Sequence, residues 1–311
     1  MPNTPAATAA LEDYRGKLPP DEMGLGIRRF FTEGSWGDLR SRVISAVVLG
    51  IFVCLLVFAG GWWFRILCCM TGFIVFDEWT KITRARRLRP HFAFARRVFH
   101  FSLLAFALGF SLVAVLIFAA GTSFLAFIDR KERKAEWLLG GLLYAGAATF
   151  APAFLRGADV AGLVTIGFLV TVVWSTDIFA YFTGRSVGGP KLMPQVSPKK
   201  TISGAVGGLV AAIVFGSLFA YAFGGVAGPL IVILAAVLSI AGQAGDLYES
   251  WIKRRFGVKD SGRLIPGHGG LMDRIDALVV AAAVAWLVGV VLAGFTHPAA
   301  GLFPVWVPMA P

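Results

Sequence analysis

Long apolar blocks dominate this sequence and constrain its fold more than any other feature. They recur from residue 43 to residue 294, and they leave the 311-residue chain 57% hydrophobic and only 15% charged. A soluble domain carries about 25% charged residues, whereas a membrane-spanning helix needs about 20 consecutive apolar residues. The block pattern therefore excludes one or two soluble domains and predicts an all-α, polytopic integral membrane protein.

Glycines and charged linkers divide the blocks into separate helices. The block 43–80 is too long for one span and is broken at Gly60-Gly61, which predicts a helical hairpin. The block 98–127 fits either one long tilted helix or a hairpin of two short helices. The remaining spans are expected at 137–155, 161–183, 204–223, 226–245 and 277–294.

The distribution of Lys and Arg decides between the two forms of the 98–127 block. With a hairpin there, 27 of the 29 basic residues lie on one side of the membrane, and only Arg65 and Arg156 lie opposite. A single helix would divide the linker residues 14 to 13 between the two sides. Because cytosolic loops carry the excess of Lys and Arg, we expect nine spans, a cytosolic N-terminus and a C-terminus outside.

Changes in composition divide the chain into four parts. We expect residues 1–40 to be a partly disordered cytosolic extension, with 24–42 as a candidate interfacial helix. Residues 41–158 form the N-terminal spans, 159–296 form the spans that carry the site, and 297–311 form a Pro-rich tail. The net charge of +11 fits loops that face an anionic leaflet and an anionic substrate, and no nucleic-acid partner is expected.

Carboxylates gather where the last spans are expected to meet the cytosol. Asp246 ends one span, and Asp273 and Asp276 lie one helical turn apart at the start of the next. Two such helix ends would present three carboxylates to one point. Oxygen ligands without cysteine are typical of Mg²⁺, which also binds substrate phosphates. The alternative is a set of juxtamembrane acids, one of them a helix cap.

A further carboxylate, Asp177, lies near the cytosolic end of an earlier span. An ionisable residue within a span is costly enough to suggest a function. The alternative is a helix-end carboxylate that pairs with Arg185, two turns further on.

Cations and glycines around the carboxylates predict phosphate binding. Gly267, Gly269 and Gly270 allow backbone N–H groups to approach a ligand just before a helix N-terminus. A second basic linker, 184–208, carries Lys, Ser and Thr residues but lacks the Walker A pattern, so a P-loop is excluded. A solvated basic loop is the alternative for both segments.

The run from Ser250 to Asp276 resembles the signature of the phosphatidate cytidylyltransferase family, also called CDP-diacylglycerol synthases. The matching residues are Ser250-Trp-Ile-Lys253-Arg254, Lys259-Asp260-Ser-Gly262 and Ile265-Pro266-Gly-His268-Gly269-Gly270-Leu-Met-Asp273-Arg274-Ile-Asp276. The segments around Asp177 and over 197–204 are also similar to the family. The resemblance covers about residues 160–295.

This resemblance implies a multi-pass enzyme of a bacterial-type inner membrane, often a homodimer, with its active site on the cytosolic face. It implies transfer from CTP to phosphatidate, giving CDP-diacylglycerol and pyrophosphate, with Mg²⁺ as cofactor and K⁺ as a further candidate ion. The family's acidic positions correspond to Asp246, Asp273 and Asp276, expected as catalytic residues and metal ligands. His268 is expected to orient a phosphate or an aspartate. The residues expected to bind the substrates are Lys199, Lys200, Thr201, Ser203, Lys253, Arg254, Lys259, Asp260, Gly269, Gly270, Arg274 and Asp177.

Two other functions stay open. A CTP-dependent polyprenol or dolichol kinase would use similar substrates but transfer a different phosphoryl group. A membrane transporter with an intramembrane acidic site would place its charged residues near the bilayer midplane, whereas here they gather near one interface. A CDP-alcohol phosphotransferase would need an Asp-Gly-x-x-Ala-Arg run, which the sequence lacks.

Overall fold

The computed structural model describes residues 35–130, 135–262 and 269–303. The chain divides into two compact units, one of residues 1–51 with 266–268 and the other of residues 52–265 with 269–311. The described part of the first unit is the beginning of one helix. The second unit contains all of the structure discussed below.

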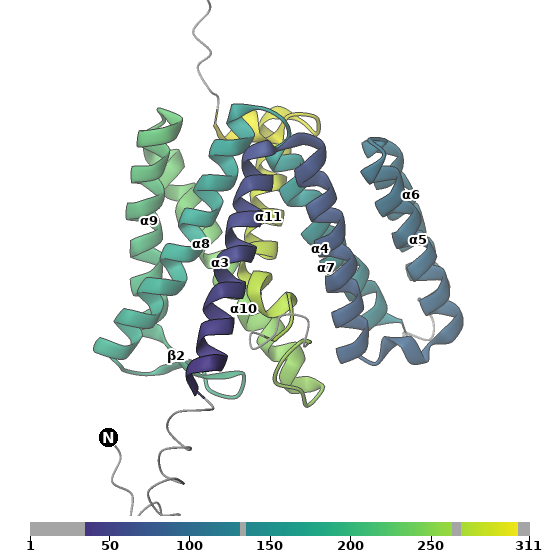
Figure 1. Ribbon diagram of the computed structural model, residues 1–311, viewed down its shortest axis with the longest axis horizontal. Coiled ribbons are helices and arrows are strands. Elements are labelled where there is room, and N and C mark those ends of the chain that lie inside the picture. Colours follow the sequence, from purple (N-terminus) through teal and green to yellow (C-terminus); the bar gives the residue numbers. More distant parts are fainter. Residues whose placement is uncertain (1–34, 131–134, 263–268, 304–311) are drawn as a thin grey trace, which may run out of the picture. The chain divides into compact units, whose positions relative to one another are not determined.

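The described part of the chain consists of nine long helices and a few short elements (Figure 1). The long helices are α3 (Ser35–Ala59), α4 (Gly61–Ile82), α5 (Arg89–Ala107), α6 (Ser111–Asp129), α7 (Glu136–Arg156), α8 (Val160–Ser186), α9 (Ile202–Gly224), α10 (Pro229–Arg255) and α11 (Met272–Ala293). The short elements are the 3-10 helix η1 (Ala85–Arg87), strands β1 (Lys191–Met193) and β2 (Ser197–Thr201), and α12 (Pro298–Leu302).

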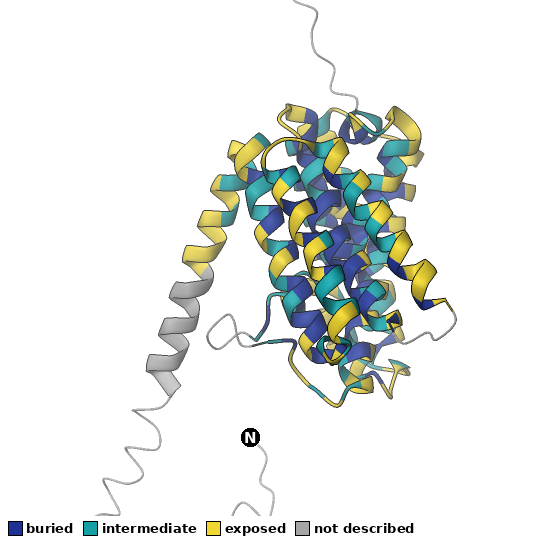
Figure 2. Ribbon diagram, turned by 90° about the vertical axis from the view of Figure 1, so that its right-hand side faces the viewer, coloured by how far each residue is buried: buried dark blue, intermediate teal, exposed yellow. Residues whose placement is uncertain are grey.

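Six of these helices, α6 to α11, are long and apolar enough to cross a membrane, counted over the described residues. Many residues of these helices are exposed (Figure 2), and they include large apolar side chains such as Leu218 and Val291. Such surfaces are stable in lipid, where helices satisfy their own backbone hydrogen bonds. The chain is therefore a helical, multi-pass membrane protein, as predicted, while nine spans and the placement of the termini stay predictions.

The 98–127 block forms two helices, as the distribution of basic residues predicted. The chain turns at Gly109, whose φ is +97°, and the amide of Phe110 donates to the carbonyl of Ala105 at 2.9 Å. Both helices have 19 residues, more than the 14–15 that each half of the block allowed. The extra length of α5 comes from residues 89–97, which we had assigned to a basic linker.

The break at Gly60-Gly61 also occurs as predicted, and Arg156 stabilises it. Gly60 has φ of +61°, and a Cβ there would lie 2.5 Å from the Arg156 guanidinium. The Nε of Arg156 donates to Val57 O at 2.6 Å and its Nη2 to Phe58 O at 3.0 Å. Arg156 thus caps the carbonyl end of α3, where a positive charge is favourable.

Consecutive helices from α4 to α11 run in opposite directions (Figure 1). The connections after α4, α6, α8 and α10 therefore lie at one end, the lower end in that view. These connections contain the basic linkers of the sequence. Their common placement agrees with the one-sided distribution of charge that we predicted.

Two departures from the predicted elements shape this end. The helix expected at 226–245 begins at Pro229 and continues ten residues further, so that Asp246 lies within α10 and not at a helix end. The basic linker 184–208 contains a two-stranded antiparallel sheet in which Lys191 pairs with Thr201, a small addition to the predicted all-α fold.

Helices α8 and α9 pack through glycines with almost no side chain between them. A Cβ on Gly204 would lie 2.7 Å from the carbonyl oxygen of Ala180, and one on Gly208 would lie 2.6 Å from that of Thr176. Small residues commonly allow such close backbone approach between membrane helices. The Thr176 hydroxyl also lies 2.8 Å from that of Ser239, which ties α8 to α10.

Candidate active site

A pocket of about 500 Å³ opens where α8, the β1–β2 hairpin, α9 and α10 meet. This volume lies within the usual range of ligand sites, about 300–1,000 Å³. The polar side chains that line it include two carboxylates and four cations: Asp177, Asp246, Arg185, Lys191, Lys199 and Lys200. The structure thus brings together four of the residues expected at the site, Asp177, Lys199, Lys200 and Asp246.

One ion pair lies across this pocket, between Lys200 at the end of β2 and Asp246 on α10. Both side chains are partly buried. The other carboxylate oxygen of Asp246 accepts from the Ser250 hydroxyl at 3.4 Å, one turn further along α10. Asp246 therefore has its position fixed from two elements.

The remaining cations of the pocket have no acidic partner among the described residues. Lys191 and Lys199 form no ion pair within that part of the chain, and Arg185 donates to the Tyr181 hydroxyl at 3.2 Å. The alternative of an Asp177–Arg185 ion pair is therefore not present. Cations without a carboxylate partner are available to an anionic ligand.

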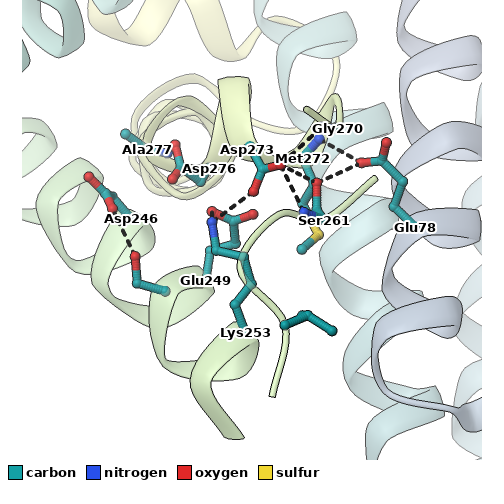
Figure 3. A network of polar contacts seen from close by, with 12 residues as sticks. Glu78, Asp246, Glu249, Lys253, Ser261, Gly270, Met272, Asp273, Asp276 and Ala277 are labelled. Carbon is teal, nitrogen blue, oxygen red and sulfur yellow. Dashed lines mark hydrogen bonds and ion pairs between the residues drawn. The ribbon is translucent and has the colours of Figure 1, made fainter. Parts of the chain in front are cut away.

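A second cluster lies beside the pocket and centres on Lys253 of α10 (Figure 3). Its Nζ lies 2.7 Å from Oδ1 of Asp273 and 3.1 Å from Oε2 of Glu249. The Lys253 and Asp273 side chains are only 11% and 12% exposed, and Glu249 is fully buried. Lys253 thus neutralises two buried carboxylates, which would be costly to leave unpaired.

The second oxygen of Asp273 holds the segment that precedes α11. Oδ2 accepts from the amide of Ser261 at 2.8 Å, from its hydroxyl at 2.8 Å and from the amide of Gly270 at 3.0 Å. Gly270 and Asp273 lie at the start of α11, where backbone N–H groups lack helical partners. Both carboxylate oxygens of Asp273 are therefore engaged, Oδ1 by Lys253 and Oδ2 by this segment.

Asp276 lies one turn into α11, between Asp246 and Glu249 (Figure 3). It interacts electrostatically with both, and its Oδ1 accepts from the amide of Ala277 at 2.8 Å. Oε1 of Glu249 is buried and accepts from no donor among the described residues, and the Glu249 and Asp276 carboxyl groups lie within hydrogen-bonding reach of each other. Two facing buried carboxyl groups repel each other when both are charged, and a shared proton or a bound cation would remove that repulsion.

Several residues predicted to bind the substrates form hydrogen bonds within the protein, around the pocket. Thr201 caps α9, its Oγ1 accepting from the amide of Gly204 at 3.1 Å, and the hydroxyl of Ser203 donates to Gly188 O. Arg254 donates to the carbonyls of Val196 and Val258, both at 3.4 Å.

The other predicted residues lie nearer to solvent or outside the described part. Lys259, Asp260 and Arg274 are exposed, and Gly269 has φ of +85° beside Asp273. His268 lies outside the described residues, so its expected role stays a prediction.

The predicted metal ligands are close neighbours but have other partners here. Within residues 35–130, 135–262 and 269–303, no group of three or more His, Cys, Asp or Glu side chains is placed to hold a metal ion. Lys200 pairs with Asp246 and Lys253 pairs with Asp273, so cationic side chains neutralise these carboxylates. The metal site of Asp246, Asp273 and Asp276 stays a prediction.

Two buried carboxylates of this site were missed in the sequence. Glu249 follows Asp246 by three residues and precedes Lys253 by four, so one face of α10 carries all three. Glu78 lies on α4, in a block that we interpreted as purely membrane-spanning, and is 4% exposed. The sequence did hold a signal for Glu78. It is an acid near the end of an apolar helix, and acids are rare in membrane spans.

The fold and the site define a multi-pass membrane protein with a charged site at one end of its helices. The model of the cytidylyltransferase family matches residues 40–292, and the chain belongs to this family. It is 43% identical over 268 residues to a phosphatidate cytidylyltransferase of Brucella suis biovar 1, covering 86% of this chain and 98% of that protein. A Brucella abortus protein of the same name is 44% identical over 258 residues, covering 82% and 95%. One from Bacillus subtilis is 41% identical over 133 residues, covering 40% and 47%.

Proposed function

We propose that this chain transfers the cytidylyl group of CTP to phosphatidate, forming CDP-diacylglycerol and pyrophosphate. Membership of the cytidylyltransferase family and the names of the Brucella relatives support this reaction. The observation that carries it is the pocket, where cations without acidic partners lie beside the Lys200–Asp246 pair. Such a pocket suits polyanionic substrates.

The proposed reaction forms one bond and breaks one. An oxygen of the phosphatidate phosphate attacks the α-phosphorus of CTP, and the bond from that phosphorus to the leaving pyrophosphate breaks. Both reactants carry negative charge, so the residues act by positioning and by neutralising charge. Lys191, Lys199 and Arg185 would hold phosphate oxygens, and Lys200 would keep Asp246 in place.

A lipid reaches this pocket along α8 in our proposal. Tyr181 lines the pocket, and the neighbouring side chains of Ile178 and Phe182 are exposed on the same helix. Apolar surface of this kind lies in lipid in a membrane protein. The acyl chains would stay against α8 while the phosphate enters the pocket beside Asp177.

Mg²⁺ fits the donor set of the site. The carboxylates of Asp246 and Asp276 supply hard oxygen donors, and Glu249 lies beside Asp276. The predicted ligands Asp246, Asp273 and Asp276 would hold the ion, and Asp273 also orients the start of α11. When bound, Mg²⁺ would supply charge neutralisation between the phosphates. K⁺ is a further candidate for the same region.

The placement in the cell is part of the proposal. The charged end of the helices faces the cytosol of a bacterial-type inner membrane, with nine spans, a cytosolic N-terminus and the C-terminus outside. The positive-inside rule supports this orientation, and the pocket at that end gives CTP access from water. A homodimer is proposed from the family resemblance alone.

An assay of the purified chain with CTP, phosphatidate and Mg²⁺ tests the reaction. We expect CDP-diacylglycerol and pyrophosphate, and product should disappear when Mg²⁺ is chelated. A polyprenol kinase would instead release CDP and phosphorylate a polyprenol, and a transporter would turn over neither substrate. Absence of CDP-diacylglycerol with the wild-type chain would overturn the proposed function.

A further inference from the structure

Glu78 lies on α4 and contacts the segment that leads into α11, almost 200 residues away along the chain (Figure 3). Its Oε1 accepts from the amide of Leu271 at 3.0 Å, and its Oε2 accepts from the amide of Met272 at 2.8 Å. Oε2 also accepts from the Ser261 hydroxyl at 3.2 Å. A side chain from the N-terminal half thus reaches the segment that carries the family signature.

These contacts supply the hydrogen-bond acceptors that the sequence at the beginning of α11 lacks. Leu271, the residue before the helix, makes no side-chain capping bond. The first amides of a helix have no partner within it, and a carboxylate at this end is favoured by the helix dipole. Glu78 therefore acts as the cap of α11 from another helix.

The Ser261 hydroxyl connects Glu78 with Asp273. Its oxygen lies 3.2 Å from Oε2 of Glu78 and 2.8 Å from Oδ2 of Asp273, so one hydroxyl proton serves two carboxylates. The backbone closes tightly around Glu78, since a Cβ on Gly262 would lie 2.5 Å from Oε1 and one on Gly270 would lie 2.8 Å from it. The segment leaves Glu78 no room to move away.

The charge of Glu78 has no cationic partner within the described part of the chain. Among the described residues, two amides and one hydroxyl stabilise it, and the side chain is 4% exposed. A neutral amide in its place would offer one acceptor oxygen and turn an NH₂ group toward a backbone N–H. These contacts therefore favour a carboxylate at position 78 over a neutral side chain of the same size.

We propose that Glu78 is a positioning residue for the reaction. By holding Ser261 and the first turn of α11, it keeps Asp273 on Lys253 and Asp276 beside Asp246. It acts through these residues and does not touch the substrates. The inference rests on the proposed cytidylyl transfer, and it adds an N-terminal residue to a site otherwise built from residues 177–276.

The test compares Glu78→Gln with Asp77→Asn, the adjacent acid of the same helix. Asp77 is half exposed and pairs with Lys81 and Arg86, away from Ser261 and Leu271. Losing a hydrogen bond to a charged group costs about 1.5–3 kcal/mol, so we expect kcat to fall roughly 10- to 100-fold in Glu78→Gln, with both KM values within about threefold of wild type. Asp77→Asn should keep the wild-type kcat.

Two further measurements separate positioning from loss of fold. Hydrogen exchange should accelerate at the amides of Leu271 and Met272 in Glu78→Gln while α7 keeps its protection. Ser261→Ala should lower kcat, and the double variant should lose no more than Glu78→Gln alone, because the two residues act as one unit. If Glu78→Gln does not fold, Glu78→Asp is the second variant, because it keeps the charge on a shorter side chain. We expect it to lower kcat and to accelerate hydrogen exchange at Leu271 and Met272, each by less than Glu78→Gln would.

Wild-type kcat together with unchanged exchange at Leu271 in Glu78→Gln would overturn the inference. So would an equal loss of kcat in Asp77→Asn, or fully additive losses with Ser261→Ala. A wild-type chain that makes no CDP-diacylglycerol would instead overturn the proposed function. The exchange measurement on Leu271 and Met272 would still decide whether Glu78 holds the start of α11.

Discussion

Lys253 and Asp273 join the end of α10 to the start of α11, with Nζ lying 2.7 Å from Oδ1 in a setting where neither side chain is more than 12% exposed. The same Nζ neutralises Glu249, so a single cation serves two buried anions. Buried ion pairs are costly to break because the remaining charge is left without a partner. Lys253 is thus essential to the structure of the site as well as a candidate for binding phosphate.

Replacing Lys253 with Met should destabilise the protein strongly. Breaking a buried pair costs about 3–5 kcal/mol, so we expect a clearly lower midpoint of thermal unfolding in detergent and loss of activity. Lys81→Met is the matched control, because Lys81 is 59% exposed in its pair with Asp77. Exposed pairs contribute about 0–1 kcal/mol. Equal midpoints for the two variants would contradict the structural role of Lys253.

Asp246→Asn should abolish formation of CDP-diacylglycerol while the protein stays folded. Asp246 pairs with Lys200 and interacts with Asp276, so the substitution removes the charge at the centre of the pocket. Removing one group that stabilises a transition state typically lowers kcat by about 100- to 1,000-fold. Product assays on equal amounts of folded protein measure the effect, and full activity would exclude Asp246 from the site.

Neutralising the unpaired cations should weaken substrate binding. Lys199→Gln and Lys191→Gln each remove a charge that has no acidic partner within the described part of the chain. We expect KM for CTP or phosphatidate to rise roughly tenfold, about 1.4 kcal/mol, with a smaller effect on kcat. Steady-state kinetics that vary one substrate at a time identify the phosphate affected. Lys81→Gln should leave both KM values unchanged, and unchanged KM values in the pocket variants would exclude these lysines from phosphate binding.

Gly270→Ala should disrupt the segment before α11. The new methyl group would overlap the Ser261 hydroxyl and lie 2.8 Å from Oε1 of Glu78. Overpacking of this kind costs about 1–3 kcal/mol, so the unfolding midpoint and activity should both fall. Gly50→Ala is the control, since a Cβ at Gly50 meets nothing within 4 Å. Wild-type behaviour of Gly270→Ala would show that the segment has more space than the structure indicates.

Labelling from outside the cell tests the nine-span topology. A cysteine in place of Ala227, in the turn between α9 and α10, should react with a membrane-impermeant reagent in intact cells. One in place of Val187, at the opposite end of the helices, should not. A reporter fused at Pro311 should read as non-cytosolic, and a cytosolic reading would overturn the predicted span count.

The helices were largely predictable because their signals are local. Apolar length and the Gly60-Gly61 pair located the first hairpin, and the distribution of Lys and Arg correctly divided the 98–127 block. Helix ends were harder to place. The predicted linker 81–97 contains the start of α5 at Arg89, and the span expected to end at 245 continues to Arg255, because both segments have side chains buried against the rest of the protein.

The site was predictable to the extent that its residues are close together in the sequence. Spacing placed Asp273 and Asp276 one turn apart, and the pocket does contain Lys199, Lys200, Asp177 and Asp246. Sequence could not show that Lys253 would pair with Asp273, because the ion pair depends on how α10 and α11 meet. Glu78 was missed for the same reason.

The glycine contact between α8 and α9 forms one wall of the pocket. Gly204 and Gly208 lie so close to the carbonyls of Ala180 and Thr176 that a side chain at either position would force the two helices apart. Asp177 and the start of α9 therefore line the pocket from two helices whose backbones are in direct contact.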